Sequence, residues 1–146
     1  MKGWLLDTNV VAELALSRPD ANVAAWARKT PEHTMFISVL TLAEYDKGIE
    51  RLPERAPERT RYRRAVDALE LRFAGRVLTV GDEVARAWGR LSGRAKRETG
   101  LWPPVIDAML AATALVHDMI LVTRNVRDVR GTGVDVLDPW NQDAAG

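Results

Sequence analysis

Short apolar segments alternate with segments of helical periodicity along almost the whole chain. The apolar runs predict strands at residues 4–6, 35–39, 76–80, 120–122 and 134–137. The periodic segments predict helices at residues 10–16, 20–29, 41–52, 53–73, 81–96 and 105–116. Parallel strands need long crossover connections, which are usually helices. The alternation therefore predicts an α/β fold in which helices cover both faces of a mostly parallel sheet of four to five strands.

The chain has 146 residues, of which 47% are apolar and 28% are charged. These values are close to the average for globular proteins and fit one domain of ordinary size. The sequence has no internal repeat, linker or low-complexity segment. We therefore expect one domain over residues 1–140 and a frayed tail at 141–146.

The residue types present limit the chemistry that the chain can perform. There is no cysteine and there are only two histidines, which excludes disulfides, thiolate metal sites, cysteine nucleophiles and a histidine-rich metal site. The chemistry must come from oxygen, and the chain has 20 carboxylates. No apolar run approaches the length of about 18 residues that a membrane span needs, and no secretory leader precedes the first strand. We therefore expect a cytoplasmic protein without membrane contact.

The segment at 105–116 is apolar around nearly every face of a helix. A helix of this kind belongs in the interior, so we expect it to be the most buried helix of the fold. Pro103 and Pro104 stop the preceding element and favour the start of this helix. Asp107 is its only charged residue and falls in its first turn.

Four acidic residues fall just beyond the carboxyl ends of predicted strands. Asp7 follows the first strand, and Glu44 lies in the predicted first turn of the next helix, three residues after a capping Thr41. Asp107 lies at the start of the buried helix, and Asp128 lies six residues after the fourth strand. Ligands of parallel α/β folds bind at this edge of the sheet. We therefore expect the four carboxylates to face one site.

Each acid also has a purely structural interpretation. Asp7 can be an N-cap, and Glu44 can complete a capping box. Asp107 can favour a helix N-terminus, and Asp128 can be an ordinary loop residue. Taken together, the four acids favour a cation site over these structural roles. Carboxylates about 4 Å apart repel by roughly 4 kcal/mol per pair at an effective dielectric constant of 20, so a fold gathers them only with something to offset that cost. A cation offsets this repulsion, and oxygen ligands without histidine or cysteine favour Mg²⁺ or Mn²⁺.

Four short motifs carry a likeness to a known family. They are Asp7-Thr8-Asn9, Thr41-Leu42-Ala43-Glu44-Tyr45, Ile106-Asp107-Ala108-Met109-Leu110-Ala111-Ala112-Thr113-Ala114, and Val122-Thr123-Arg124-Asn125 followed by Asp128. In this order and at these separations they resemble the motifs of the PIN-domain ribonucleases, and most of all those of VapC-type toxins from type II toxin–antitoxin systems. The likeness extends from about residue 4 to residue 140.

The resemblance implies a three-layer α/β/α fold and an endoribonuclease toxin that depends on Mg²⁺ or Mn²⁺ and cuts RNA with a metal-activated water. It also implies a cognate antitoxin and a homodimer. The positions that match the family's core acids are Asp7, Glu44 and Asp107, with Asp128 at the more variable fourth position. The supporting polar residues are Thr8, Asn9, Thr123 and Asn125, and Arg124 is a candidate RNA contact.

Two positions depart from the family pattern. Val129 stands where an aromatic residue is usual, and Asn125 stands where some members have aspartate. Both departures bear on whether a second metal ion binds.

A separate arginine-rich segment, residues 51–64, has six arginines against two glutamates. Charge runs usually form a solvated face, so we favour that interpretation over an RNA-binding surface.

Other classes of protein also have an aspartate at the end of a strand. Haloacid-dehalogenase-type phosphotransferases need a second aspartate two residues later, where this chain has Asn9. Receiver-like signalling modules need a late lysine, and none follows Lys96. Glycine-rich nucleotide-binding motifs are absent. The alternatives to a nuclease are a phosphoryl-transfer or phosphate-binding protein with an aspartate-based metal site, and a catalytically silent PIN-like binding module.

Overall fold

The computed structural model describes residues 2–141, which fold around a five-stranded sheet. Every strand pair is parallel, and the strand order is β3-β2-β1-β4-β5. The strands are β1 (Trp4–Leu6), β2 (Met35–Ser38), β3 (Val77–Leu78), β4 (Ile120–Val122) and β5 (Val136–Leu137). The predicted parallel sheet is confirmed. β3 and β5 are shorter than their apolar runs because each lies at an edge and pairs on one side only.

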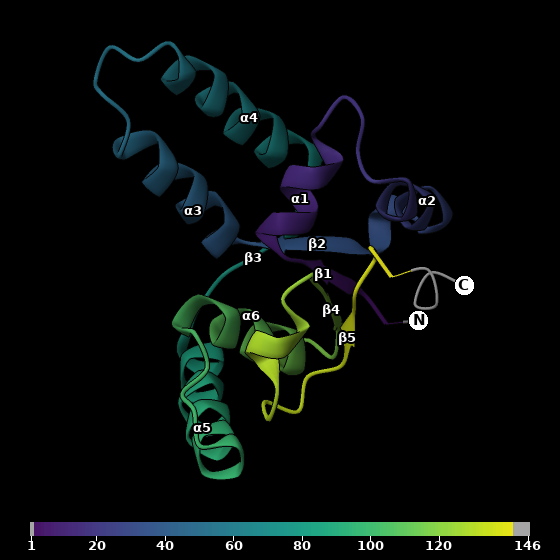
Figure 1. The fold of residues 1–146 in the computed structure, drawn as a ribbon, viewed down its shortest axis with the longest axis vertical. Helices are drawn as coiled ribbons and strands as arrows, with labels where there is room; N and C mark the ends of the chain where they lie inside the picture. The colour runs from purple at the N-terminus through teal and green to yellow at the C-terminus, as the bar shows by residue number, and fades with distance from the viewer. Residues whose placement is uncertain (1, 142–146) are drawn as a thin grey trace.

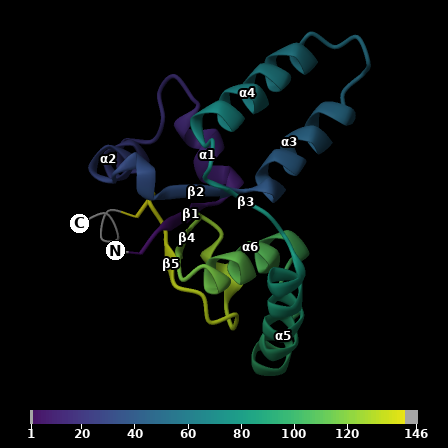
Figure 2. The same cartoon turned by 180° about the vertical axis from the view of Figure 1, so that it is seen from behind.

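Helices cover both faces of the sheet and give the fold three layers (Figures 1 and 2). One layer contains α1 (Thr8–Leu14), α2 (Ala21–Lys29), α3 (Val39–Glu50) and α4 (Glu58–Arg72). The other contains α5 (Asp82–Thr99) and α6 (Val105–Val116). Two 3₁₀ turns complete the fold, η1 (Glu32–Thr34) and η2 (Val126–Val129). The predicted three-layer α/β/α fold is therefore confirmed, and α3 and α4 form a hairpin that extends away from the sheet (Figure 1).

The central strand β1 is buried on both faces. Leu5 packs with Leu110 and Leu121 beneath the α5–α6 layer. Leu6 packs with Val10 and Val122 beneath the opposite layer. Successive side chains point to opposite faces of a strand, and a fully buried leucine contributes about 1.5–3 kcal/mol. Packing from both sides therefore fixes the strand and, with it, the position of the residues that follow its carboxyl end.

α6 is the most buried helix, as its composition predicts. Its buried residues are Ala108, Leu110, Ala111, Ala112, Thr113 and Ala114. Its first turn is different, because Val105 and Ile106 are exposed. Within residues 2–141, no helix is both long enough and apolar enough to cross a membrane. The predicted tail lies outside the described residues except for Asn141, whose backbone N–H donates to Asp138.

The predicted capping box at Thr41 and Glu44 is wrong. α3 begins at Val39, directly after β2, and its N-cap is Ser38, whose hydroxyl accepts a hydrogen bond from the Leu40 backbone N–H at 3.0 Å. The predicted strand at 35–39 obscured this start because its last residue, Val39, belongs to the helix and not to the strand. Thr41 is consequently fully buried inside α3, and Glu44 lies in the second turn, free of any capping role.

The predicted helix at 53–73 begins later, at Glu58, and a loop precedes it. Arg59 holds this loop, because its guanidinium donates to the carbonyl oxygens of Leu52 at 3.0 Å and Glu50 at 3.4 Å. Its side chain is only 13% exposed. The solvated interpretation of the arginine-rich segment is therefore wrong for Arg59. The other arginines of this segment, namely Arg51, Arg55, Arg61, Arg63 and Arg64, are exposed, and for them the choice between a solvated face and an RNA-binding surface stays a prediction.

Candidate functional site

The structure brings the four predicted acids to one edge of the sheet. Asp7 follows β1, and Glu44 lies on the helix that continues from β2. Asp107 lies in the first turn of α6, and Asp128 lies on η2, which follows β4. β2, β1 and β4 are adjacent and parallel, so their carboxyl ends meet. The charges of the other three acids all act on Asp107, which shows that the four carboxylates share one electrostatic site.

Asp7 is the most enclosed of the four acids. It is 5% exposed and accepts hydrogen bonds from the Thr8 backbone N–H and the Thr123 hydroxyl, both at 2.7 Å. The Asn9 amide lies 3.4 Å from the same carboxylate. Asp7 is also the N-cap of α1, as its structural interpretation predicts. One side chain therefore starts the helix and faces the site.

Thr123 orients Asp7 from the far end of the sequence. Its hydroxyl donates to Asp7 Oδ2 and accepts from the Asn125 backbone N–H at 2.9 Å. The residue is 1% exposed, so water does not compete for this hydroxyl. Its backbone N–H continues the ladder with a bond to Leu137. The carboxylate of Asp7 is therefore held in one orientation by a residue that the sheet itself positions.

Thr8 orients the carboxylate of Glu44 by a hydrogen bond, as Thr123 orients that of Asp7. Its hydroxyl lies 2.8 Å from Glu44 Oε1, to which it donates, and 3.1 Å from the hydroxyl of Thr41. Sequence reasoning missed Thr41 as a member of this network because it assigned that residue to a helix cap. The available signal was the spacing, since residues three apart on a helix lie on the same face. Thr41 and Glu44 thus meet Thr8 together.

The carboxylates impede one another's ionisation. The pKa of Asp107 is raised to about 6, mainly by burial. Three further carboxylates also raise it, in decreasing order Asp7, Asp128 and Glu44, while a hydrogen bond from the Asn125 side chain lowers it. Burial likewise raises the pKa of Asp7, against the hydrogen bonds from Thr123 and Thr8. At neutral pH the site holds negative charge at a cost in stability, and a cation would remove that cost.

The chemistry of the donor set fits a hard divalent cation. All four side chains supply carboxylate oxygens, which are the ligands that Mg²⁺ and Mn²⁺ prefer. Among residues 2–141, no three acidic or histidine side chains stand close enough together to enclose one ion.

The remaining predicted residues lie around the same edge. The Arg124 backbone N–H is 3.5 Å from Asn9 Oδ1, but its guanidinium stacks over the Trp140 ring, 5.0 Å from the centroid. This contact gives Arg124 a structural role, and its RNA contact stays a prediction. Val129, at the position where an aromatic residue is usual, is 5% exposed and packs into the core beneath α6.

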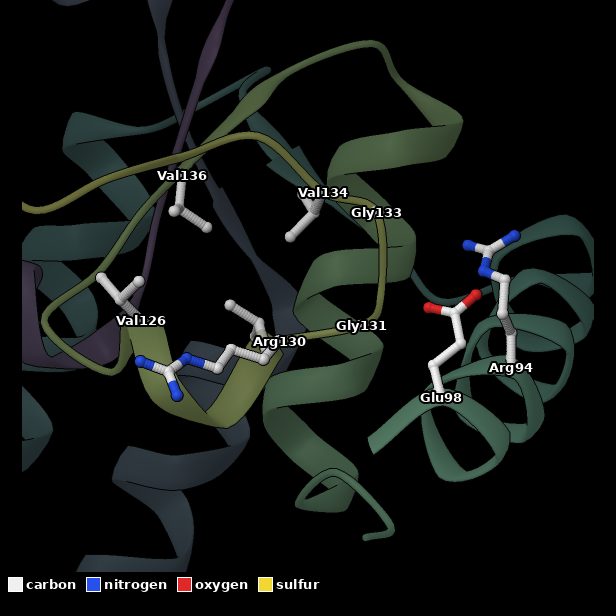
Figure 3. A pocket seen from close by; sticks show the side chains of 9 residues that line it. Arg94, Glu98, Val126, Arg130, Gly131, Gly133, Val134 and Val136 are labelled. Atoms are coloured by element: carbon white, nitrogen blue, oxygen red, sulfur yellow. The ribbon is translucent and has the colours of Figure 1, made fainter. Parts of the chain in front are cut away.

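Two cavities flank the acids, and a third lies apart. A cavity of about 260 Å³ borders Thr8 and Glu44 between α1, α3 and α4. A larger one of about 510 Å³ borders Asp128 on the other side. Figure 3 shows the third cavity, about 550 Å³, between the end of α5 and the segment 126–136, and none of the four acids lines it. Glu44 therefore borders one cavity and Asp128 another.

Comparison with known proteins identifies the family. The sequence family described as PIN domain matches residues 4–130 of the chain. The chain therefore belongs to the PIN-domain family, as its four motifs predict.

Individual relatives narrow the comparison to toxins. The chain is 32% identical over 137 residues to VapC ribonuclease Y4jK from Sinorhizobium fredii, covering 93% of this chain and 96% of that protein. It is 29% identical to toxin FitB from Neisseria gonorrhoeae, covering 94% and 98%. The crystal structure of FitAcB from Neisseria gonorrhoeae matches with a TM-score of 0.83 at 29% identity, covering 94% and 99%. The homologues of this chain thus include VapC and FitB toxins.

Proposed function

We propose that this chain is the ribonuclease toxin of a toxin–antitoxin pair and cleaves RNA phosphodiester bonds with Mg²⁺ or Mn²⁺. The observation that carries this proposal is the joint placement of Asp7, Glu44, Asp107 and Asp128 at the carboxyl ends of three adjacent strands. The likeness to a VapC ribonuclease and to toxin FitB supports both the activity and the biological role.

The four carboxylates would hold the cation, and two of them have a polar partner that fixes their orientation. Thr123 orients Asp7, and Thr8 orients Glu44. When bound, a divalent cation polarises the scissile phosphate and lowers the pKa of a nearby water. With such a cation in place, the carboxylates would orient the water for attack on the phosphorus; the bond from phosphorus to the ribose 3′ oxygen would break, and the products would carry 5′-phosphate and 3′-hydroxyl ends.

A ribonuclease of this kind needs a partner that keeps it silent in the cell. The likeness to FitB favours a cognate antitoxin as that partner. The two cavities that border Glu44 and Asp128 offer such a partner space to bind beside the site. We propose that the toxin, its antitoxin and its RNA substrates meet in the cytoplasm, and that the toxin forms a homodimer there.

Expression of the wild-type chain in a bacterial host should arrest growth, and Asp7→Asn should abolish the arrest. Asparagine keeps an oxygen that can accept from Thr123, but it removes the charge that binds a cation. Asp46→Asn is the matched control, because Asp46 is exposed on α3, outside the site. The measurements are growth after induction, protein abundance by immunoblot, and new 5′-phosphate RNA ends. Growth arrest by a well-expressed Asp7→Asn protein would place the toxicity outside the acid site.

A further inference from the structure

A groove beside Asp128 is not explained by the metal site alone. It has a volume of about 510 Å³ and lies between the end of α5, the connection before α6 and the turn η2. The lining residues that matter here are Leu101, Trp102, Pro104, Arg127, Asp128 and Arg130. Asp128 lines this groove and its charge acts on Asp107, so the groove borders the acid site.

The apolar side of the groove presents an unburied aromatic ring. Trp102 is 66% exposed and Leu101 is 74% exposed. The backbone is restrained on one side of the ring, because α5 ends at Gly100 and two prolines directly follow Trp102. An exposed tryptophan on a restrained segment loses little freedom when it binds a flat ligand. Nucleic-acid bases stack on such rings whatever their sequence.

The opposite side of the groove carries positive charge. Arg127 and Arg130 are both exposed, and in the described part of the chain neither forms an ion pair with a carboxylate. Arg127 lies within η2 and Arg130 directly follows it, and both line the groove. Two guanidinium groups without acidic partners suit the phosphates of a nucleic acid.

We propose that this groove is a nucleotide subsite, in which an unpaired base next to the scissile phosphate stacks on Trp102 while Arg127 and Arg130 contact the adjoining phosphates. This inference rests on the proposed ribonuclease function and specifies its substrate as RNA that is single-stranded on this side of the cut. A base can stack on a side chain only when it is not already paired and stacked in a duplex.

Charge and continuity favour RNA over a protein occupant. An apolar protein segment would use Leu101 and Trp102 but would leave the two guanidinium groups without partners. A symmetric dimer closed over the groove would bring the arginines of both copies into one interface, where like charges repel. A phosphodiester strand satisfies both sides of the groove and leads to Asp128 without a break.

The test measures binding of a labelled single-stranded RNA by the full chain in an Asp7→Asn background, which prevents cleavage. Trp102→Ala and Trp102→Leu should each weaken binding by about 10-fold or more in the dissociation constant, because neither side chain lets a base stack on an aromatic ring. Trp102→Phe should retain most of the affinity. Leu71→Ala, at a site that is 81% exposed on α4, is the matched control and should change nothing. Arg127→Ala should make binding less sensitive to salt, with a logarithmic slope smaller by about 0.7 for each phosphate that the arginine neutralises.

The outcomes separate this inference from the proposed function. Wild-type protein that neither binds nor cuts RNA would refute the proposed function and this subsite together. Normal cleavage by wild type, with unchanged RNA affinity in the folded Trp102→Ala and Trp102→Leu variants, would overturn the subsite alone. So would retained affinity in Trp102→Leu, since leucine preserves apolar contact without a ring. Loss of dimer or of antitoxin binding at unchanged RNA affinity would assign the groove to a protein interface and overturn the proposal.

Discussion

Asp107→Asn is expected to abolish RNA cleavage while leaving the cation-free fold at least as stable as the wild type. Asp107 is the only charge on the buried helix α6, and its pKa of about 6 shows that ionisation is unfavourable there. Asparagine removes that charge and can still accept a hydrogen bond from Asn125. We expect the cation-free variant to gain about 1–2 kcal/mol in unfolding free energy at pH 7, after allowance for solvent screening.

Urea unfolding with EDTA and cleavage of labelled RNA with Mg²⁺ measure the two effects on the same preparations. Loss of cleavage should exceed about 100-fold, because Asp107 is a proposed ligand and removal of a residue that only supports a ligand already costs about 10–100-fold. Asp67→Asn, an exposed change on α4, is the control and should alter neither property. If Asp107 only complements the helix N-terminus, the variant would instead lose about 0.3–1 kcal/mol and keep its activity. That result would show that Asp107 serves only to stabilise the helix N-terminus.

Mg²⁺ or Mn²⁺ is expected to stabilise the protein strongly at pH 7.5 and weakly at pH 5. Asp107 has a folded-state pKa of about 6, above the ordinary value of 3.8, so the folded state holds its proton more tightly than the unfolded state. Its contribution to stability is therefore fully present below about pH 4 and is lost as the pH rises through 6. The pKa of Asp7 is also raised, so its contribution to stability changes with pH in the same direction. The cation must displace these protons, so its effect grows as they leave.

Thermal unfolding at several pH values, with EDTA or with saturating Mg²⁺, measures this linkage. A cation at about 100 times its dissociation constant stabilises a folded protein by roughly 2.7 kcal/mol, which is a shift of several degrees for a domain of this size. Asp107→Asn should flatten the pH dependence in EDTA and reduce the shift by Mg²⁺. Equal stabilisation at pH 5 and pH 7.5, or none at either, would contradict a carboxylate site for the cation.

Local sequence pattern was sufficient to predict the strands and the helices, although it misplaced the starts of α3 and α4. Asp7 follows a short apolar run, and Asp107 is the lone charge of an apolar helix, so both positions stand out without a structure. Because a parallel α/β sheet collects the carboxyl ends of its strands at one edge, the meeting of the four acids followed from the pattern. The strand order, with β1 between β2 and β4, was beyond reach because it depends on packing between distant segments.

Contacts between distant residues account for what the sequence did not predict. The bond from Thr123 to Asp7 joins residues 116 positions apart, and no periodicity reports such a pairing. Arg59 is one of six arginines in residues 51–64, and the sequence does not distinguish it from the others. In the structure it alone among them holds a loop through backbone carbonyls. Arg124 rests on Trp140 for the same kind of reason. Side chains of one type differ in role when the fold gives them different neighbours.

The most direct test of the proposed metal nuclease is cleavage of a 5′-labelled single-stranded RNA by the purified chain, freed of any bound protein. Three reactions are compared: wild type with Mg²⁺, wild type with EDTA, and Asp7→Asn with Mg²⁺. We expect discrete products with 3′-hydroxyl ends in the first reaction alone, and recovery of cleavage when excess Mg²⁺ is added to the second. Undiminished cleavage in EDTA, or by Asp7→Asn, would contradict the assignment of these carboxylates to a metal-dependent ribonuclease centre.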